Sequence, residues 1–278
     1  MARDQMRIAR VTDDELEVAE HCHDGAGQLN YSGHWNQDDF ETPWFFVHYG
    51  SLPPGGGIGH HRHVNCEEMF VTFDNAAQFT HNGRTVQVEG GACVPCRKGE
   101  SHAIYNHTDK PTRWMNFCVA DPGGGYDATD FGEDRVGARL ESADRIPLGR
   151  FDRSLLVNHT EVHEGRGEIG VLPIWEHSDF RTNWYFASQV LMPPGTSIGY
   201  HRHDTLEETY VVMNGSGRMT VDDETEEVHA GDSIPSRLGG SHGLYNHTQE
   251  DLELFVMAVT MERGVADSVN HDDDLLSR

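Results

Sequence analysis

The sequence has few basic residues and no long hydrophobic run. Lysine and arginine together number 21, against 46 aspartate and glutamate residues, which gives a formal net charge of −25. A surface of that charge repels nucleic acid and anionic lipid, so we expect neither nucleic acid nor a membrane as a partner. No stretch of 18 apolar residues occurs, and the N-terminus lacks the apolar core of a signal peptide. These absences predict a protein that works away from membranes.

Cysteine is scarce as well. The five cysteines are an odd number, and all of them lie in the first half of the chain, at Cys22, Cys66, Cys93, Cys96 and Cys118. This distribution favours reduced thiols in a cytoplasm over a disulfide framework. Cys93 and Cys96 have the CxxC spacing of some zinc sites, but a single pair without a second is weak support for zinc.

The composition is that of a folded β protein. The chain has 278 residues, of which 36% are hydrophobic and 9% aromatic, enough for two domains that each bury a core. Thirty glycines and 11 prolines are spread along it and punctuate many short strands. Asn82-Gly83 between two β-prone runs predicts a hairpin, and residues 13–21 predict one or two short helical turns.

An internal repeat at a constant offset of 140 residues organises the chain. Between Trp35 and Thr108, 30 of 74 positions are identical to their partners without a gap. The repeat predicts duplicated domains, which we place at residues 1–125 and 126–278, with a linker at about 121–145. The conserved pairs include Pro53-Pro54-Gly55 with Pro193-Pro194-Gly195, His61-Arg62-His63 with His201-Arg202-His203, and Ser101-His102 with Ser241-His242.

Each copy contains three histidines and one glutamate at spacings suited to a metal site. His61 and His63 are two residues apart, so on a strand both imidazoles point to the same face. Glu68 follows after a short bend, and His102 arrives on a neighbouring strand. Three neutral nitrogens and one carboxylate suit a divalent transition metal. The second copy offers His201, His203, Glu208 and His242 at the same spacings.

These motifs resemble those of the cupin superfamily. Its first motif is Gly, five residues, His-x-His, three or four residues, Glu, six residues and Gly, which the second copy matches at every position and the first copy matches except for Asn75 in place of the last glycine. In the second motif, Arg97 and Arg237 stand where the family has proline. The resemblance implies an all-β fold of two tandem cupin barrels, a double-stranded β-helix or jelly roll, with little helix. The family's spacing also selects Glu68 and Glu208 as ligands, and Glu67 and Glu207 as their outward neighbours.

The resemblance further implies one divalent transition metal per domain. Iron is our first choice, with manganese, nickel, copper, cobalt or zinc as alternatives, because ligand type does not select among them. Two coordination positions would stay open for a small-molecule substrate or O2. Arg97 and Arg237 are candidates to bind a substrate carboxylate, with a structural ion pair as the alternative.

The predicted function is a metal-dependent oxidoreductase, most simply a dioxygenase, acting on a small carboxylated or hydroxylated organic molecule. A non-oxidative isomerase, decarboxylase or lyase is the first alternative, and a non-enzymatic small-molecule-binding cupin is the second. One of the two metals could also be purely structural, and the histidines could instead pack a barrel that holds no metal. We expect the C-terminal copy, which has the complete first motif, to be the more active, and the resemblance predicts a homodimer.

Overall fold

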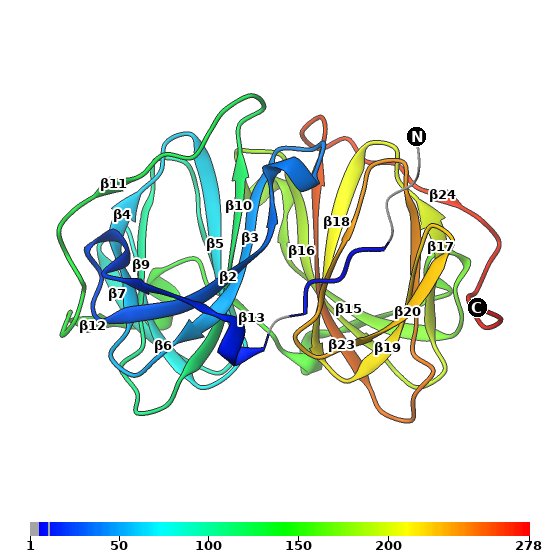
Figure 1. Cartoon of the computed structure of the whole chain (residues 1–278), viewed down its shortest axis with the longest axis horizontal. Helices are drawn as coiled ribbons and strands as arrows, with labels where there is room; N and C mark the ends of the chain where they lie inside the picture. Colours follow the sequence, from blue (N-terminus) through cyan, green and yellow to red (C-terminus); the bar gives the residue numbers. More distant parts are fainter. Residues whose placement is uncertain (1–5, 11) are drawn as a thin grey trace.

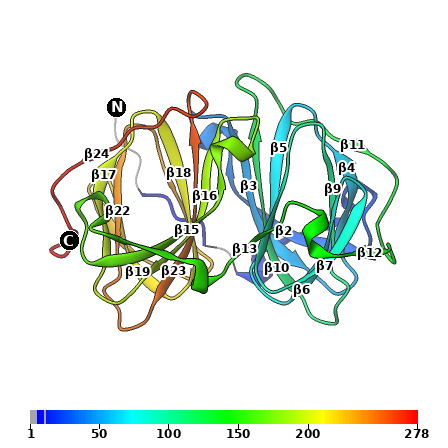
Figure 2. The ribbon, with the colours of Figure 1, turned by 180° about the vertical axis from the view of Figure 1, so that it is seen from behind.

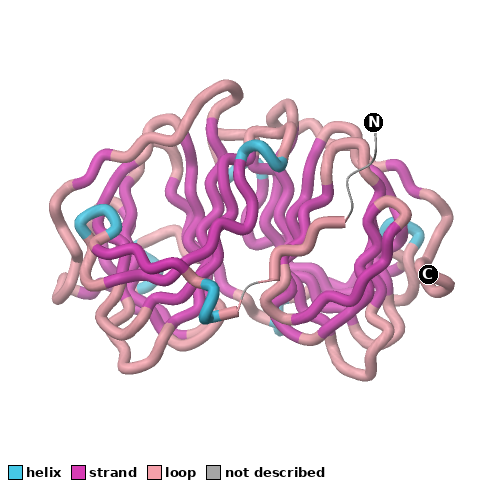
Figure 3. Tube along the Cα trace, viewed as in Figure 1, coloured by secondary structure: helices cyan, strands magenta, loops and turns pink. Residues whose placement is uncertain are grey.

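The chain forms two β-barrels that lie side by side (Figure 1). The computed structural model describes residues 6–10 and 12–278. Strands make up most of both barrels, and the helical segments are short turns (Figure 3). The all-β fold of two barrels with little helix, predicted from the sequence, is confirmed.

Each barrel consists of two facing sheets whose strands follow the same order, as the repeat predicts, except that each sheet of the first barrel has one additional edge strand. In the first barrel, one sheet has the strand order β1 (Glu17–Glu20), β2 (Gln28–Asn36), β3 (Trp44–Leu52), β10 (Thr112–Ala120), β5 (Cys66–Thr72), β8 (Ala92–Cys96) and β13 (Gly149–Arg150). The facing sheet has the order β11 (Thr129–Asp130), β4 (Gly57–Arg62), β9 (Ser101–Tyr105), β6 (Ala76–His81), β7 (Arg84–Glu89) and β12 (Leu140–Glu141). In the second barrel, one sheet has the strand order β14 (Val157–Thr160), β15 (Glu168–Glu176), β16 (Trp184–Met192), β23 (Leu252–Thr260), β18 (Leu206–Asn214) and β21 (Ser233–Ser236). The facing sheet has the order β20 (Glu224–His229), β19 (Ser216–Val221), β22 (Ser241–Tyr245), β17 (Ser197–Arg202) and β24 (Val269–Asn270).

Helical structure in the described residues consists of three-residue 3₁₀ turns. They are η1 (Asp13–Glu15), η2 (Cys22–Asp24), η3 (Gln37–Asp39), η4 (Ala143–Arg145), η5 (Arg153–Leu155), η6 (Val162–Glu164) and η7 (His177–Asp179). The region predicted to hold one or two turns contains η1, and η2 begins just after it. Within the described part of the chain, no helix has the length and apolar character needed to span a bilayer.

The turn residues behave as their chemistry predicts. Asn82 and Gly83 connect β6 to β7 with φ values of 48° and 78°, so the predicted hairpin is confirmed. Asn75 replaces the family glycine with a φ of 48°, while its partner Gly215 has a φ of 82°. The Asn75 amide also donates hydrogen bonds to the hydroxyls of Thr108 and Thr112 at 2.7 and 2.9 Å, which stabilises this left-handed turn.

The two barrels share a hydrophobic core in addition to the core inside each one. Strand β5 illustrates this, because Phe70 faces the interior of its own barrel while Met69 and Val71 face the other barrel. Trp44 and Trp184 meet edge to face across the contact, with ring centroids 5.0 Å apart. Because this sheet is covered on both faces, every residue of β5 is buried.

In each barrel, a strand forms backbone pairs with a segment that belongs, by sequence, to the other half of the chain. Ala9 pairs with Ser233 in β21 of the second barrel, and Gly149 pairs with Cys93 in β8 of the first. Figure 1 shows residues 6–10 crossing the second barrel, and Figure 2 shows β13 at the centre of the molecule. Strands β11 and β12 fasten the predicted linker to the first barrel, and β13, which follows the linker, pairs with the same barrel. The domain boundary near residue 125 stays a prediction.

Two buried glutamates fasten the barrels to each other. Glu67 is fully buried and accepts hydrogen bonds from the backbone of Arg181 and Thr182, at 2.9 Å each, in the second barrel. Glu207, 1% exposed, accepts in turn from Glu41 and Thr42 of the first barrel. Both side chains point away from their own metal-ligand sets, as predicted, but they enter the contact between the barrels.

Candidate metal centres

The strands of the first barrel bring its four predicted ligands together. His61 on β4 lies directly opposite His102 on β9, in the same sheet. An irregularity in the pairing between Ile58 and His61 adjusts the direction of this strand at the site. Glu68 reaches the same point from β5 in the facing sheet, so the set spans the interior of the barrel.

The ligand atoms of the first set converge on one point. The His102 Nε2 atom lies 3.0 Å from His61 Nε2 and 3.4 Å from His63 Nε2. The Glu68 oxygens lie 3.5 Å from the Nε2 atoms of His63 and of His102. All four side chains are buried, and one ligand atom from each lies within 4.8 Å of the others.

The second barrel repeats this arrangement. Its ligand atoms also lie within 4.8 Å of one another, and all four side chains are buried. The closest contact joins His242 Nε2 to Glu208 Oε2 at 2.8 Å, and His203 Nε2 lies 3.9 Å from the same oxygen. The structure thus brings together both sets predicted from the sequence, and ligation of a metal by them stays a prediction.

Unpartnered polar atoms support a cation at both points. The Glu68 Oε1, His201 Nε2 and His203 Nε2 atoms are buried and have no hydrogen-bond partner. Such atoms are costly to bury unless something else compensates them. Burial lowers the pKa values of His61 and His201 to about 2, so both rings stay neutral, which is the form that binds metal. The donor sets therefore fit a divalent transition metal.

The backbone orients the strand histidines through their other ring nitrogens. His61 Nδ1 is 2.8 Å from the Gly59 carbonyl oxygen, and His63 Nδ1 bonds the Asp127 carbonyl. In the second barrel His201 Nδ1 bonds the Gly199 carbonyl at 2.8 Å. When each Nδ1 carries the proton and donates it to the carbonyl, Nε2 is left free to face the ion.

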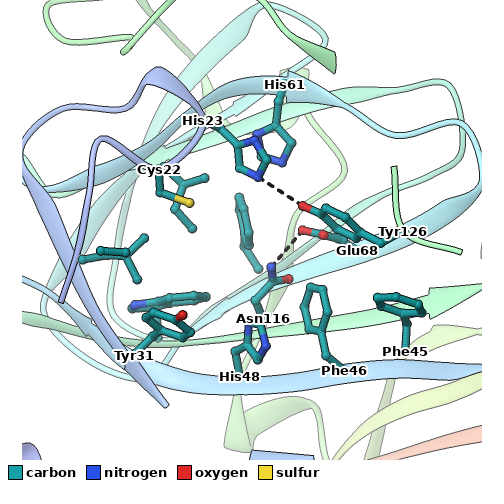
Figure 4. Close-up of a pocket in the computed structure, with 15 residues that line it drawn as sticks. Cys22, His23, Tyr31, Phe45, Phe46, His48, His61, Glu68, Asn116 and Tyr126 are labelled. Carbon is teal, nitrogen blue, oxygen red and sulfur yellow. Dashed lines mark hydrogen bonds between the residues drawn. The ribbon is translucent and has the colours of Figure 1, made fainter. Parts of the chain in front are cut away.

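A cavity of about 340 Å³ adjoins the first ligand set. Figure 4 shows His61 and His23 on one side of it, Glu68 and Tyr126 on another, and Phe46 and His48 opposite. Its lining consists of Ala19, Cys22, His23, Leu29, Tyr31, Phe45, Phe46, His48, Ile58, His61, Glu68, Phe70, Trp114, Asn116 and Tyr126. A volume of this size accommodates a small organic molecule.

The equivalent cavity in the second barrel is smaller, at about 130 Å³. Its lining consists of Val162, His163, Ile169, Val171, Phe186, Ser188, Val190, Ile198, Glu208, Tyr210 and Val256. Val256 occupies the repeat position of Asn116, and Ser188 that of His48. The two metal sets are alike, but the space beside them differs in size and in polar groups.

A further pair of site residues, His23 and His163, was not assigned from the sequence. The His23 ring stacks on His61 with centroids 3.8 Å apart, and His163 stacks on His201 at 3.7 Å. Both have positive φ values, 52° and 53°, which strain a non-glycine backbone. The repeated pattern His-acid-Gly at residues 23–25 and 163–165 was the only signal of this role in the sequence.

The hydrogen-bond partners of these stacked histidines differ between the barrels. His23 Nδ1 lies 2.7 Å from Asp130 Oδ1, and His23 Nε2 lies 3.1 Å from the Tyr126 hydroxyl. In the second barrel, His163 Nδ1 bonds the Asn270 side chain at 3.1 Å. The carboxylate and the tyrosine are therefore features of the first barrel.

The two arginines predicted to bind substrate lie at the contact between the barrels. Arg97 Nε donates to the Asp179 carbonyl, and Arg237 Nε donates to the Asp39 carbonyl at 2.9 Å. Neither side chain lines the cavity beside its ligand set. A substrate-binding role for them stays a prediction, and this placement does not support it.

The CxxC pair, Cys93 and Cys96, lies outside both predicted ligand sets. All five cysteines are free. Cys93 and Cys96 belong to none of the clusters of metal-ligating side chains found in the described part of the chain. Cys93 instead accepts a hydrogen bond from the Trp175 indole at 3.2 Å, across the contact between the barrels.

Comparison with known proteins places both halves in one family. The sequence model of the cupin domain family matches residues 48–119 and 188–258, which include all eight predicted ligands. Among curated proteins, an oxalate-binding protein of Thermotoga maritima is 25% identical over 97 residues, which cover 35% of this chain and 80% of that protein.

Solved structures show the same architecture over nearly the whole chain. Oxalate decarboxylase of Bacillus subtilis, studied for its Mn(II) centres, superposes with a TM-score of 0.64 and 16% identity over 97% of this chain and 80% of that one. Salicylate 1,2-dioxygenase of Pseudoaminobacter salicylatoxidans, in complex with gentisate, gives a TM-score of 0.65 and 15% identity over 87% and 78%. At these identities the likeness establishes the fold.

Proposed function

The chain belongs to the cupin family, with one cupin domain in each half, and we propose that it is a metal-dependent enzyme whose reaction takes place in the first barrel. The observation that carries this proposal is the cavity of about 340 Å³ whose wall includes two predicted ligands, His61 and Glu68. A substrate held there lies next to the ion. The sequence favoured the C-terminal copy, but the space beside its ligands is less than half as large.

The ion would be held by His61, His63, Glu68 and His102, with iron as our first choice and manganese, nickel, copper, cobalt or zinc as alternatives. Bound there, it would supply a Lewis acid or a site for O2. The second set, His201, His203, Glu208 and His242, would hold an ion with a mainly structural role, since little room remains beside it.

The chain's own residues would prepare the site. Asn116 Nδ2 donates to Glu68 Oε2 at 2.8 Å, which fixes the carboxylate so that Oε1 stays free. Phe46, Phe70 and Trp114 give the cavity an apolar aromatic wall. A substrate that displaces water from this wall would strengthen the electrostatic interactions around it. We propose dioxygenation of a small organic molecule as the reaction.

A decarboxylase is the second candidate, because two likenesses point to oxalate. The relative from Thermotoga maritima is named for oxalate binding, and the fold of Bacillus subtilis oxalate decarboxylase covers 97% of this chain. Because the Thermotoga maritima relative is named for binding alone, a non-enzymatic small-molecule binder is the third candidate. Against the decarboxylase stands the cavity lining, which in the described part of the chain contains no lysine or arginine to hold a second carboxylate.

Metal analysis together with oxygen uptake tests the proposal. Protein purified without a metal-affinity step is analysed for its elements and then assayed with candidate substrates in an oxygen electrode. Iron, copper or nickel with O2 consumption supports dioxygenation, whereas manganese or zinc with CO2 release and no O2 consumption supports the decarboxylase. Protein that contains no metal contradicts both.

Matched variants locate the reaction. His61→Ala should abolish turnover. His201→Ala, at the same position of the repeat, should retain turnover when the rate is expressed per folded molecule. Circular dichroism and metal content report folding and loading independently of turnover. If only His201→Ala abolishes turnover, the reaction does not take place in the first barrel.

A further inference from the structure

We propose that the first cavity binds an uncharged, planar ring compound that carries hydroxyl groups, such as an aromatic diol, in preference to a dicarboxylate. This inference rests on the proposed function, because it places the substrate in that cavity. It depends on three features of the lining, namely its charge, its aromatic walls and one unpartnered hydrogen-bond acceptor.

The charge of the lining disfavours a dicarboxylate. Among the residues that the structure describes, no lysine or arginine lines the cavity, while the Glu68 carboxylate forms part of its wall. Arg97, the arginine closest in sequence to the ligand His102, donates to the backbone of the other barrel. An ion held by the ligand set could balance one carboxylate of a bound molecule. A second carboxylate would be buried without a partner, which is strongly unfavourable.

Aromatic side chains give the cavity flat walls. The Phe70 ring stacks on His102 with centroids 4.2 Å apart and planes at 7°. On another side, Phe46 stacks on His48 at 4.0 Å and 6°. Tyr126 stacks on Phe45 at 5.9 Å, and its hydroxyl is held by His23. Planar rings bind well between such surfaces, through offset or edge contacts.

The decisive feature is an acceptor that has no donor. Asn116 is 6% exposed, and its Nδ2 is committed to the Glu68 carboxylate, which fixes the direction of the amide. Its Oδ1 atom is buried and has no hydrogen-bond partner. Only a donor satisfies this atom, so a ligand that fills the cavity should bring a hydroxyl or an N–H group to it. An ionised carboxylate has no proton to donate.

Binding of matched probes to the intact protein loaded with zinc tests the proposal, because zinc does not oxidise a diol. Isothermal titration compares catechol with three other probes. Phthalate carries two carboxylates on the same ring, 1,2-dimethoxybenzene lacks the hydroxyl protons, and oxalate is a dicarboxylate without a ring. We expect catechol to bind, 1,2-dimethoxybenzene to bind about tenfold more weakly, and phthalate and oxalate about 100-fold more weakly or not measurably.

Variants taken from the repeat assign the binding to this cavity. Asn116→Val installs the residue that the second barrel has, and it should weaken catechol binding about tenfold. Val256→Ala, at the same position of the second barrel, should leave catechol binding unchanged. The zinc content and melting temperature of each variant show whether the site and the fold survive. If Asn116→Val lowers the zinc content or the melting temperature, the smaller replacement Asn116→Ser is tested instead.

Each outcome separates this inference from the proposed function. Phthalate or oxalate binding as tightly as catechol overturns the inference, as does catechol binding that Asn116→Val leaves unchanged. Catechol binding in a protein that turns over no substrate contradicts the proposed function alone. Turnover of a dicarboxylate by protein that does not bind catechol contradicts the inference alone.

Discussion

Replacing Glu207 with glutamine should weaken the contact between the two barrels. The Glu207 Oε2 atom accepts from the Thr42 backbone at 2.9 Å and the Thr42 hydroxyl at 2.6 Å, and the Oε1 atom accepts from the Leu238 backbone at 3.1 Å. The Glu41 backbone also donates, at 3.0 Å from Oε2. Every partner is a donor, so an acceptor-only carboxylate fits this position.

The size of the loss follows from these bonds. Glutamine keeps one acceptor oxygen, but its NH2 group must then face at least one N–H group that loses its partner. A hydrogen bond to a charged group contributes about 1.5–3 kcal/mol, and an unsatisfied buried donor costs about 1–3 kcal/mol. Since Glu207 is 1% exposed, water does not replace the lost acceptor. We therefore expect the free energy of unfolding to fall by about 2–4 kcal/mol.

Urea unfolding followed by tryptophan fluorescence measures this change, since Trp44 and Trp184 meet at the contact. Glu67→Gln, the same change at the matching position, should cost a similar amount, because Glu67 has equivalent partners. Glu89→Gln on the exposed surface is the control and should lie within about 0.5 kcal/mol of the wild type. If both buried variants also stay within that limit, these carboxylates do not hold the barrels together and the reasoning is wrong.

Two further predictions concern pH and metal. Burial, with the nearby His48, lowers the pKa of His34 to about 4, well below the value near 6.5 of an unfolded histidine, so stability should fall as the pH drops below 6.5. Between pH 7 and pH 5 this loss should reach about 2 kcal/mol in urea unfolding, and a His34→Gln variant with an equally steep loss would contradict it. Removing the metal with a chelator should lower the melting temperature by about 5 °C, reversibly on adding back the ion. An unchanged melting temperature, with metal loss verified by elemental analysis, would show that the ligand sets do not stabilise the fold through an ion.

Local sequence patterns predicted the strands, the hairpin and the composition of both ligand sets. Residues two apart on a strand share a face, so His61 and His63 converge for reasons visible in the chain itself. The offset of 140 residues then carried each local inference from one copy to the other. Asn82-Gly83 formed its hairpin because both residues tolerate positive φ, which is a property of the residues rather than of their surroundings.

The space beside each ligand set depended on residues whose proximity no local pattern shows. Asn116 and Tyr126 both line the first cavity, one from β10 and the other from the segment that follows it. Their counterparts, Val256 and Ala266, differ at positions that the motifs do not include. The sequence therefore favoured the copy with the more complete motif, while the tertiary structure gave the larger cavity to the other.

What the sequence by itself determined was the duplication, the β architecture and which residues could meet at each ion, because spacing along strands and turn chemistry act over a few residues. Only the tertiary structure decided that Arg97 and Glu67 serve the contact between barrels. A charged side chain beside a ligand looks the same in sequence whether it faces substrate or a neighbouring barrel. Which of these it meets depends on how two outer sheet faces pack, and that packing joins residues more than 80 positions apart.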